Sequence, residues 1–551
     1  MKYRMAWAFV CMGWIQPPAG CLGASAPTNF PCAESAFEKA LAPSTPHQET
    51  TQEPPAKPAQ VTSKLWTQFQ EARAAGEATT LADFSYAGYH CGEKTIPTAA
   101  WKTFDVTRFG AVADDGKSDK DAIQIAIQAA EKNGSGVVFF PKGRFRINEA
   151  QDAFNEPIAI RSSQIVLRGS GCTSGGTELF MDRHMDARDP SKLWTAPYLI
   201  QFIGPGASKT RTTVTADAAR ESHTVQVADA TGFQPGQWIR LSLKNNAPEL
   251  VSLAVAPHKP KPAWTSLIEK GVMIDEYHRI ESVDGARLTF REPIHAAIKA
   301  SSGWKVLLCR PLEEIGVEDI AFRGNWLEKF VHHKNAIHDG GWSMLSLGRC
   351  ANSWVRNCRF TDVNRSITVA NSTAVSVENV RIDGNKGHSA INFSNTSHSI
   401  MRYVSDLAGT WHACGVSGRS SGNVVLRCEY RADTCYEAHA SQPRWTLFDN
   451  ISGGWKYGRW GGAQHNQPNH MRGLVFWNYR NTGKGVPGEF HFMRHDRKYG
   501  FIIMPYVIGF HGNAQAWAKA AIEVLESNGA PVLPESLYEA QLALRTGTFS
   551  K

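Results

Sequence analysis

The sequence lacks several patterns that assign a function directly. It has no CxxC or CxH spacing of a zinc site, no glycine-rich nucleotide loop, and no Ser-His-Asp pattern for nucleophilic catalysis. Its basic residues are dispersed without a motif that reads nucleic acid, although the formal net charge is +8. We therefore predict no zinc site and no nucleic-acid partner.

A membrane-spanning run is also missing. The apolar run Met5 to Ile15 follows Lys2 and Arg4, and it is too short to cross a bilayer. Small residues follow through Ala26, so we predict a signal peptide over 1–26 and a secreted or periplasmic protein. Cys21 forms an imperfect lipoprotein site, which we disfavour. Residues 27–62 are rich in proline and predict a flexible leader.

One apolar pattern is present and recurs six times between residues 353 and 479. Its units are Val355/Cys358/Phe360, Val377/Val380/Ile382, Ile400/Tyr403/Ser405, Val425/Cys428/Tyr430, Phe448/Ile451/Gly453 and Leu474/Trp477/Tyr479. Each unit alternates as a β-strand does and is too short to bury its apolar face alone, so stacked coils of a parallel β-helix are predicted. The dense leucine spacing of a leucine-rich repeat is missing.

Two further features fit stacked coils. Cys358 and Cys428 occupy interior positions and are predicted to be buried free thiols, while any disulfide stays unassigned. Asn357, Asn379 and Asn450 each precede a second ladder position, which is typical of asparagines that stack in turns.

An amphipathic helix is predicted ahead of the coils. Ser118 and Asp121 form a capping box, Ile123, Ile127 and Ala130 share one face, and the helix ends near Asn133. A strand over 137–140 and the turn at 141–143 follow. Such a helix would cap the open end of a solenoid.

These residues carry a family resemblance. The stretches Phe104–Ile123 and Val137–Ile147 resemble the opening coil of the pectate-lyase-like superfamily, with its "FGA…DG…D…AI" helix and "V.FP.G.Y.I" strand. The resemblance implies an all-β fold, a right-handed single-stranded parallel β-helix, over most of residues 101–510. It does not choose among lyases, hydrolases and phage tailspikes. The stretches 83–89 and 534–542 also look like a secreted subgroup usually regarded as polysaccharide lyases.

The remaining organisation follows from these landmarks. We expect an N-terminal segment with the first coils over 63–204, a β-rich insertion over 205–310, main coils over 311–510 and a helical tail over 511–551. In the tail, one helix is predicted from Asn513 to Asn528 and a second after Pro534. The insertion either forms one wall of a substrate groove or makes no contact with substrate.

Candidate site residues lie five to nine positions after the third ladder positions, or close to them. Coils stack about 4.8 Å apart, so side chains at a shared offset would line one cleft of sugar-chain length. The predicted face contains Arg365, Lys386, His388, Trp411, His412, Arg419, Glu437, His439, Arg444, Arg459, Trp460 and His465. His332-His333 has no ladder position and is left at the edge.

The predicted chemistry is β-elimination of a uronic-acid polysaccharide. It requires a base for the C5 proton, an acid for the leaving oxygen and a cation for the carboxylate. We assign His412 or His439 as base, the other as acid or orienting group, and Arg459 or Arg444 as carboxylate clamp. The other residues of the face would contact an anionic polysaccharide, and the protein is expected to be a monomer.

Two other functions stay open. A glycoside hydrolase would need paired carboxylates, which Asp362, Asp383, Asp406 and Asp433 could supply. The same aspartates could instead bind calcium, the one cofactor left open, or close turns. A non-catalytic carbohydrate-binding or adhesin-like β-helix is the second alternative. The crowding of titratable residues on one face favours an enzyme.

Overall fold

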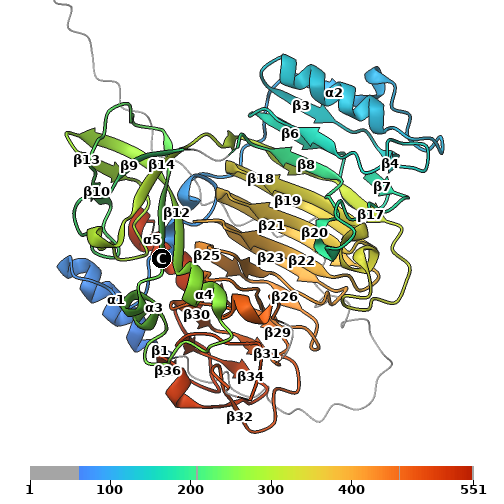
Figure 1. Ribbon diagram of the computed structural model, residues 1–551. Helices are drawn as coiled ribbons and strands as arrows, with labels where there is room; N and C mark the ends of the chain where they lie inside the picture. Colours follow the sequence, from blue (N-terminus) through green and yellow to red (C-terminus); the bar gives the residue numbers. More distant parts are fainter. Residues whose placement is uncertain (1–60, 207–208, 458–459, 495, 549–551) are drawn as a thin grey trace, which may run out of the picture.

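The chain forms a right-handed parallel β-helix with a side domain (Figure 1). The computed structural model describes residues 61–206, 209–457, 460–494 and 496–548. The predicted signal peptide and nearly all of the predicted leader lie outside the described residues. Within these ranges, no helix is long and apolar enough to cross a membrane.

The largest parallel sheet contains a strand or two from every coil. Its strands are β2 (Thr103–Asp105), β3 (Gly136–Phe139), β4 (Gly143–Asn148), β6 (Ile165–Arg168), β7 (Thr177–Met181), β15 (Leu312–Glu313), β16 (Gly316–Glu318), β17 (Ala321–Gly324), β19 (Cys350–Thr361), β21 (Thr373–Asp383), β23 (Ile400–Asp406), β25 (Ser421–Leu426), β26 (Glu429–Tyr430), β28 (Arg444–Asp449), β29 (Ser452–Gly453), β30 (Leu474–Trp477), β31 (Arg480–Asn481), β33 (Tyr506–Ile508), β34 (His511–Gly512) and β36 (Val524–Glu526).

A second parallel sheet forms another face of the same coils. Its strands are β5 (Ile158–Ile160), β8 (Ile200–Ile203), β18 (Ser343–Gly348), β20 (Arg365–Ala370), β22 (Ser389–Ser394), β24 (Gly415–Ser417) and β27 (Glu437–Ala438). The candidate site lies at the short turns that lead from the largest sheet into these strands.

The predicted ladder is correct for four of its six units. Val355 pairs with Val377, and Phe360 pairs with Ile382, as expected. The third unit is wrong by one residue because Val377 pairs with Met401 rather than with Ile400. The sixth is wrong by two because Phe448 pairs with Phe476 rather than with Leu474.

A second apolar layer explains the errors. Ile400 and Trp477 belong to a core on the outer face of the largest sheet, where they pack with residues from both ends of the chain such as Trp66 and Tyr538. Both faces of these strands are therefore apolar, and alternation alone could not choose the inward side.

The turn asparagines and the interior thiols are confirmed. Asn357 and Asn379 have φ of 51° and 54°, and the Asn379 Nδ2 donates to Asn357 Oδ1 at 3.3 Å. Asn450 shares the turn conformation, with φ of 54°, but its Nδ2 donates to Glu535 Oε1 at 2.9 Å rather than to an asparagine of a neighbouring coil. Cys358 and Cys428 are buried and free.

The capping helix α2 (Lys120–Lys132) covers the first coil (Figure 1). It buries Ile123, Ile127 and Ala130 as predicted. Its start differs from the capping box, because Asp119 is the N-cap residue and makes no capping bond with its side chain. The Asp119 Oδ1 instead accepts from the Val112 amide at 2.7 Å, which ties the helix to the preceding loop.

The predicted insertion is a six-stranded antiparallel sheet with two helices. Its elements are β9 (Thr210–Thr213), β10 (Thr224–Gln226), β11 (Trp238–Asn245), α3 (Pro248–Val255), α4 (Thr265–Lys270), β12 (Val272–Asp284), β13 (Arg287–Phe290) and β14 (Lys305–Cys309). It contacts the coils through Arg419, which pairs with Asp275 at 2.8 Å, and Arg444, which donates to the Met273 carbonyl.

The two ends of the described chain meet. Strand β1 (Val61–Thr62) pairs with β37 (Val532–Leu533), so the last two residues of the predicted leader form a strand. Helix α1 (Lys64–Ala75) follows β1, and α5 (Leu537–Thr546) is the helix predicted after Pro534. The helix predicted over 513–528 is wrong. Trp517 in β35 (Ala516–Trp517) packs against the rings of Phe510 and Phe490, and β36 extends the largest sheet.

The cap of α5 predicts a pH-dependent stability. Asp449 Oδ2 accepts from Ser536 Oγ at 2.7 Å and from the Tyr538 amide at 2.8 Å. Burial raises the pKa of Asp449 from 3.8 to about 7. Because this folded-state pKa is raised, its stability contribution is present below pH 3.8 and is lost as pH rises towards 7.

Asp449→Asn is therefore expected to flatten the pH dependence of the unfolding midpoint between these limits. The change corresponds to a few kcal/mol at most, on the order of 1.4 kcal/mol per pKa unit. Thermal unfolding of both proteins across this pH range measures it. Parallel profiles would contradict the assignment.

Candidate active site

Three predicted histidines stack where turns meet the second sheet. His388 precedes β22, His412 precedes β24 and His439 follows β27. The ring centroids of His388 and His412 lie 5.0 Å apart, and those of His412 and His439 lie 4.8 Å apart. This spacing is close to the coil repeat, so the helix itself sets the distance between the imidazoles.

Glu437 holds two of these rings. Its Oε2 accepts from His412 Nδ1 at 2.9 Å, and its Oε1 lies 3.1 Å from His439 Nδ1 and accepts from the Gly461 amide at 2.9 Å. Burial alone would raise the pKa of Glu437, but the attraction and hydrogen bonds of His412 and His439 outweigh it and lower the pKa to about 2. Glu437 is therefore an anion that orients both imidazoles.

A loop without a ladder position adds a fourth histidine to the three that stack. His332 lies between β17 and β18, and its ring centroid is 5.3 Å from that of His388 and 5.5 Å from that of His412. It also stacks on Trp411 at 4.7 Å. We call His332, His388, His412 and His439 the histidine cluster.

The same loop supplies Asp339. Its backbone carbonyl accepts from His388 Nδ1 at 2.7 Å, and its carboxylate lies 2.6 Å from His333 Nδ1. The loop has no coil periodicity, so a ladder argument could not place it. The close spacing of His332-His333 and His338-Asp339 was the available signal.

The members of the histidine cluster differ in how deeply they are buried. Burial lowers the pKa of two of them. It lowers the pKa of His332 to about 4, helped by neighbouring imidazoles, and lowers that of His388 well below its usual value. The side chain of His412 is 5% exposed, whereas that of His439 is 38% exposed. His439 is thus the member of the stack most open to a polymer.

Three other predicted residues lie around the cluster. Arg365 opens β20, and its charge helps to lower the pKa of His388. Lys386 lies two residues before His388 and pairs with Asp433 at 3.6 Å. The ring of Trp411 stacks on that of His332.

The structure places four predicted residues elsewhere, and Arg459 lies outside the described residues. Arg444 and Arg419 contact the insertion, as described above, so neither is positioned as a carboxylate clamp for the cluster. Trp460 is 4% exposed and packs on Tyr436, because this coil is filled by aromatic rings. His465 is exposed on a short helical turn.

The four aspartates of the hydrolase alternative are held in turns or ion pairs. Asp406 is buried and accepts from the Gly409 and Thr410 amides. Asp383 pairs with Arg359 and Arg381, Asp362 pairs with Arg323, and Asp433 pairs with Lys386 and Arg431. These contacts favour the turn-closing interpretation over paired catalytic acids.

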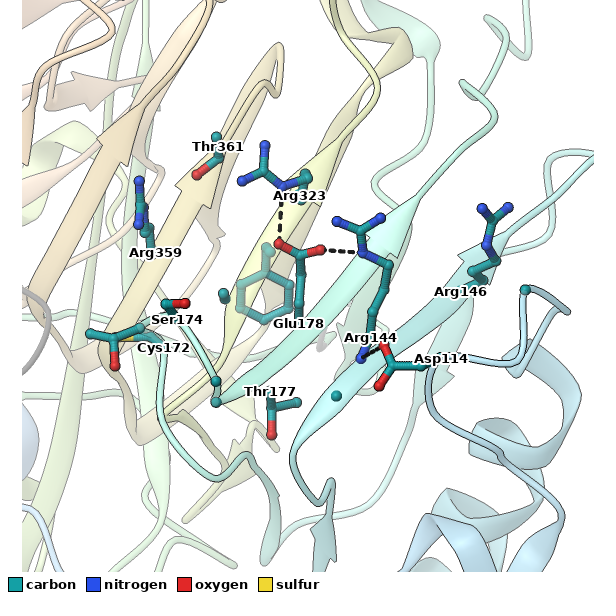
Figure 2. Close-up of a pocket in the computed structure, with 17 residues that line it drawn as sticks. Asp114, Arg144, Arg146, Cys172, Ser174, Thr177, Glu178, Arg323, Arg359 and Thr361 are labelled. Atoms are coloured by element: carbon teal, nitrogen blue, oxygen red, sulfur yellow. Dashed lines mark hydrogen bonds and ion pairs between the residues drawn. The ribbon is translucent and has the colours of Figure 1, made fainter.

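An arginine-lined cleft of ≈ 610 Å³ lies on the outer face of the first coils. We define this arginine cleft by Arg144, Arg146, Arg323 and Arg359, with Asp114 and Glu178 as the acidic residues of its lining. Figure 2 shows Glu178 between Arg144 and Arg323, with N–O distances of 2.6 and 2.9 Å. Within this lining, guanidinium groups outnumber carboxylates, which favours an anionic ligand. Arg146, Arg323 and Arg359 also pair with Glu149, Asp362 and Asp383 beside the cleft, which offsets part of this charge.

A short path of contacts joins the arginine cleft to the histidine cluster. Arg323 pairs with Asp362 at 3.1 Å, and Asp362 accepts from the Asn385 amide at 2.8 Å. His388 lies three residues beyond Asn385. The residues of the cleft come from strands on both sides of the insertion, so no local sequence pattern brings them together.

Three overlapping sets of side chains could hold a metal ion. They are His332/His388/His412, His333/Asp339/His388 and His412/Glu437/His439, and the ligand atoms within each set lie within 4.8 Å of one another. Among the described residues, these sets include none of the four aspartates considered for calcium.

Two family models match different parts of the chain. Residues 103–184 match the family "Rhamnogalacturonase A/epimerase, pectate lyase-like", which covers the capping helix and the first coils. The chain contains a pectate-lyase-like β-helix domain. The resemblance found in the sequence is thereby confirmed. Residues 409–551 match a family described as a domain of unknown function, DUF4955, and that segment includes His412, Glu437 and His439.

Curated relatives match this chain over a short segment. Alginate lyase 7 of Azotobacter vinelandii is 38% identical over 68 residues, which is 12% of this chain and 8% of that protein. Mannuronan C5-epimerase AlgE3 of the same organism is 35% identical over 68 residues, 12% of this chain and 4% of that protein. The matches thus span under a tenth of either relative.

Solved structures are similar at a low level. The tailspike protein gp49 from Pseudomonas phage LKA1 has a TM-score of 0.40 and 13% identity, with 73% of this chain and 64% of that chain covered. The exopolygalacturonase from Thermotoga maritima has a TM-score of 0.35 and 11% identity, with 81% and 86% covered. The family match over residues 103–184 and the stacked parallel sheets together describe a pectate-lyase-like β-helix.

Proposed function

We propose that this chain is a secreted polysaccharide lyase that cleaves a uronic-acid polymer by β-elimination. The observation that carries the proposal is the hydrogen-bonded row His412–Glu437–His439, with one imidazole buried and the other open to solvent. An ionised carboxylate behind an accessible imidazole is the arrangement of an oriented general base.

His439 is assigned as the base and His412 as a positioning residue. His439 takes the C5 proton of the uronate, the C4–O4 bond breaks, and a C4=C5 double bond forms. Protonated His439 then returns the proton to the leaving oxygen. Glu437 stabilises the imidazolium in between, because its pKa of about 2 keeps it ionised.

The arginine cleft supports an anionic polymer as substrate. Its guanidinium groups lie along stacked strands, and a polyuronate carries one carboxylate on each sugar. Short matches to an alginate lyase and to mannuronan C5-epimerases support polymannuronate as the first polymer to test. Epimerisation would share the removal of the C5 proton but would not break the chain.

The function is tested by incubating the purified protein with a panel of polyuronates and following the ultraviolet absorbance of unsaturated products. A rise in absorbance is expected with at least one polymer. New reducing ends without that absorbance would favour the hydrolase. Binding without any product would favour the adhesin-like alternative.

Gly461 offers a sharp test of the site geometry. A Cβ built on Gly461 would lie 1.8 Å from Cε1 and 2.0 Å from Nδ1 of His439, so Gly461→Ala must displace this ring. We expect the lyase rate to fall by about 10²-fold, because a shift of about 1 Å in a catalytic group has that effect.

Gly206→Ala is the matched control for this substitution. A Cβ at Gly206 has no atom within 4 Å, so its rate should equal that of the wild type. Equal rates for both glycine variants would show that the position of His439 does not matter.

A further inference from the structure

Three imidazoles of the histidine cluster converge from separate parts of the chain. His332 comes from the loop between β17 and β18, His388 from the turn before β22 and His412 from the turn before β24. One ligand nitrogen of each lies within 4.8 Å of the other two. Zinc with Zn–N bonds of about 2.1 Å holds nitrogens roughly 3.4 Å apart in a tetrahedral site, so small side-chain rotations would close the set.

The hydrogen bonds of His388 fix which nitrogen is offered. Its Nδ1 faces the Asp339 carbonyl at 2.7 Å, and a carbonyl only accepts, so Nδ1 carries the proton and Nε2 carries the lone pair. His388 is 8% exposed, and its Nε2 is buried without a hydrogen-bond partner in the described chain. His332 Nε2 is also buried and without such a partner there. Leaving both nitrogens unbonded is costly unless a ligand occupies the space between them.

Outer partners orient the rings as they do in metal sites. His412 Nδ1 is held by Glu437 Oε2 at 2.9 Å, and His388 Nδ1 is held by a backbone carbonyl. Carboxylates and carbonyls on the second nitrogen are the usual partners of metal-binding histidines.

We propose that His332, His388 and His412 bind a divalent transition-metal ion of the zinc type. Three neutral imidazoles suit zinc, cobalt, nickel or copper, whereas calcium requires oxygen ligands. A zinc-type site differs from the sequence-based expectation of no zinc site. That expectation considered cysteine motifs, whereas these three histidines are separated by 56 and 24 residues.

The three ligands leave a fourth position for water or for an oxygen of the substrate. If the proposed lyase function holds, on which this role rests, the ion would neutralise the uronate carboxylate beside His439. Of the two arginines assigned as clamp by sequence, Arg444 contacts the insertion instead, and Arg459 lies outside the described residues.

Metal binding is measured without polysaccharide, which separates it from the lyase reaction. The purified full chain is treated with a chelator, desalted and titrated with Zn²⁺ against a chromogenic indicator, and with Co²⁺ to record visible absorption. We expect one ion per chain, a cobalt spectrum of nitrogen ligation and no competition by Ca²⁺.

Matched variants distinguish the three possible ligand sets. His332→Ala should weaken Zn²⁺ binding by at least about 100-fold, and Glu437→Gln by about 10–100-fold as an outer partner. His333→Ala and His439→Ala should bind as the wild type does. His332 lies on a loop, so its variant should keep the circular dichroism spectrum of the folded chain.

Several results would overturn the proposal. They are no Zn²⁺ binding by the wild type, undiminished binding by His332→Ala, or loss of binding in His333→Ala or His439→Ala. Zinc binding without any lyase product would instead keep the metal site and remove the proposed function.

Discussion

Replacing His439 with alanine is expected to lower the lyase rate by about 10²- to 10⁴-fold, the usual contribution of a general base. The imidazole is partly exposed and held by Glu437, which fits a group that takes a proton from substrate. Polymer binding should change little, because the substitution leaves the arginine cleft intact. Initial rates over a range of polymer concentrations separate the two effects.

His511→Ala is the matched histidine control. His511 lies in β34, and its Nδ1 donates to the Gly509 carbonyl at 2.8 Å, remote in sequence from the turns of the histidine cluster. Its rate should stay within about twofold of the wild type. A folded His439→Ala protein with an unchanged rate would remove His439 from the mechanism.

Replacing Trp455 with alanine is expected to produce the largest loss of stability. Trp455 is 2% exposed, and its ring centroid lies 5.1 Å from those of Tyr436, Phe476, Tyr479 and Phe510. Removing a buried indole costs about 3–5 kcal/mol through lost burial and the cavity left behind. Urea unfolding followed by circular dichroism measures the shift of the midpoint.

Trp194→Ala is the control for this substitution. Trp194 is 66% exposed, so its loss should change stability by no more than about 0.5 kcal/mol. Similar midpoints for the two tryptophan variants would mean that the aromatic core around Trp455 does not stabilise the coils.

The coil architecture is predictable from the sequence because its apolar pattern repeats from coil to coil. Units such as Val355/Cys358/Phe360 return at nearly constant spacing, and their paired registers set the distance between His388 and His412. Register fails at Ile400 and Trp477, where the chain ends cover the outer face and both sides of the strand are apolar.

The candidate site was predictable where it lies on coils and not where it lies on a loop. His388, His412, Glu437 and His439 share an offset from the ladder, so sequence alone gathers them. His332 reaches the same place through a loop with no repeat. Arg444 opens β28 and is turned into the insertion, whose packing no periodicity reveals.

We propose that the chain breaks a uronic-acid polymer by elimination at the histidine cluster. Mass spectrometry of the oligosaccharides formed from polymannuronate tests it most directly, because elimination adds no water and hydrolysis adds one. We expect products with an unsaturated end, one water lighter than hydrolysis products of the same length, and none of them from His439→Ala. Products that all carry the added water would contradict it.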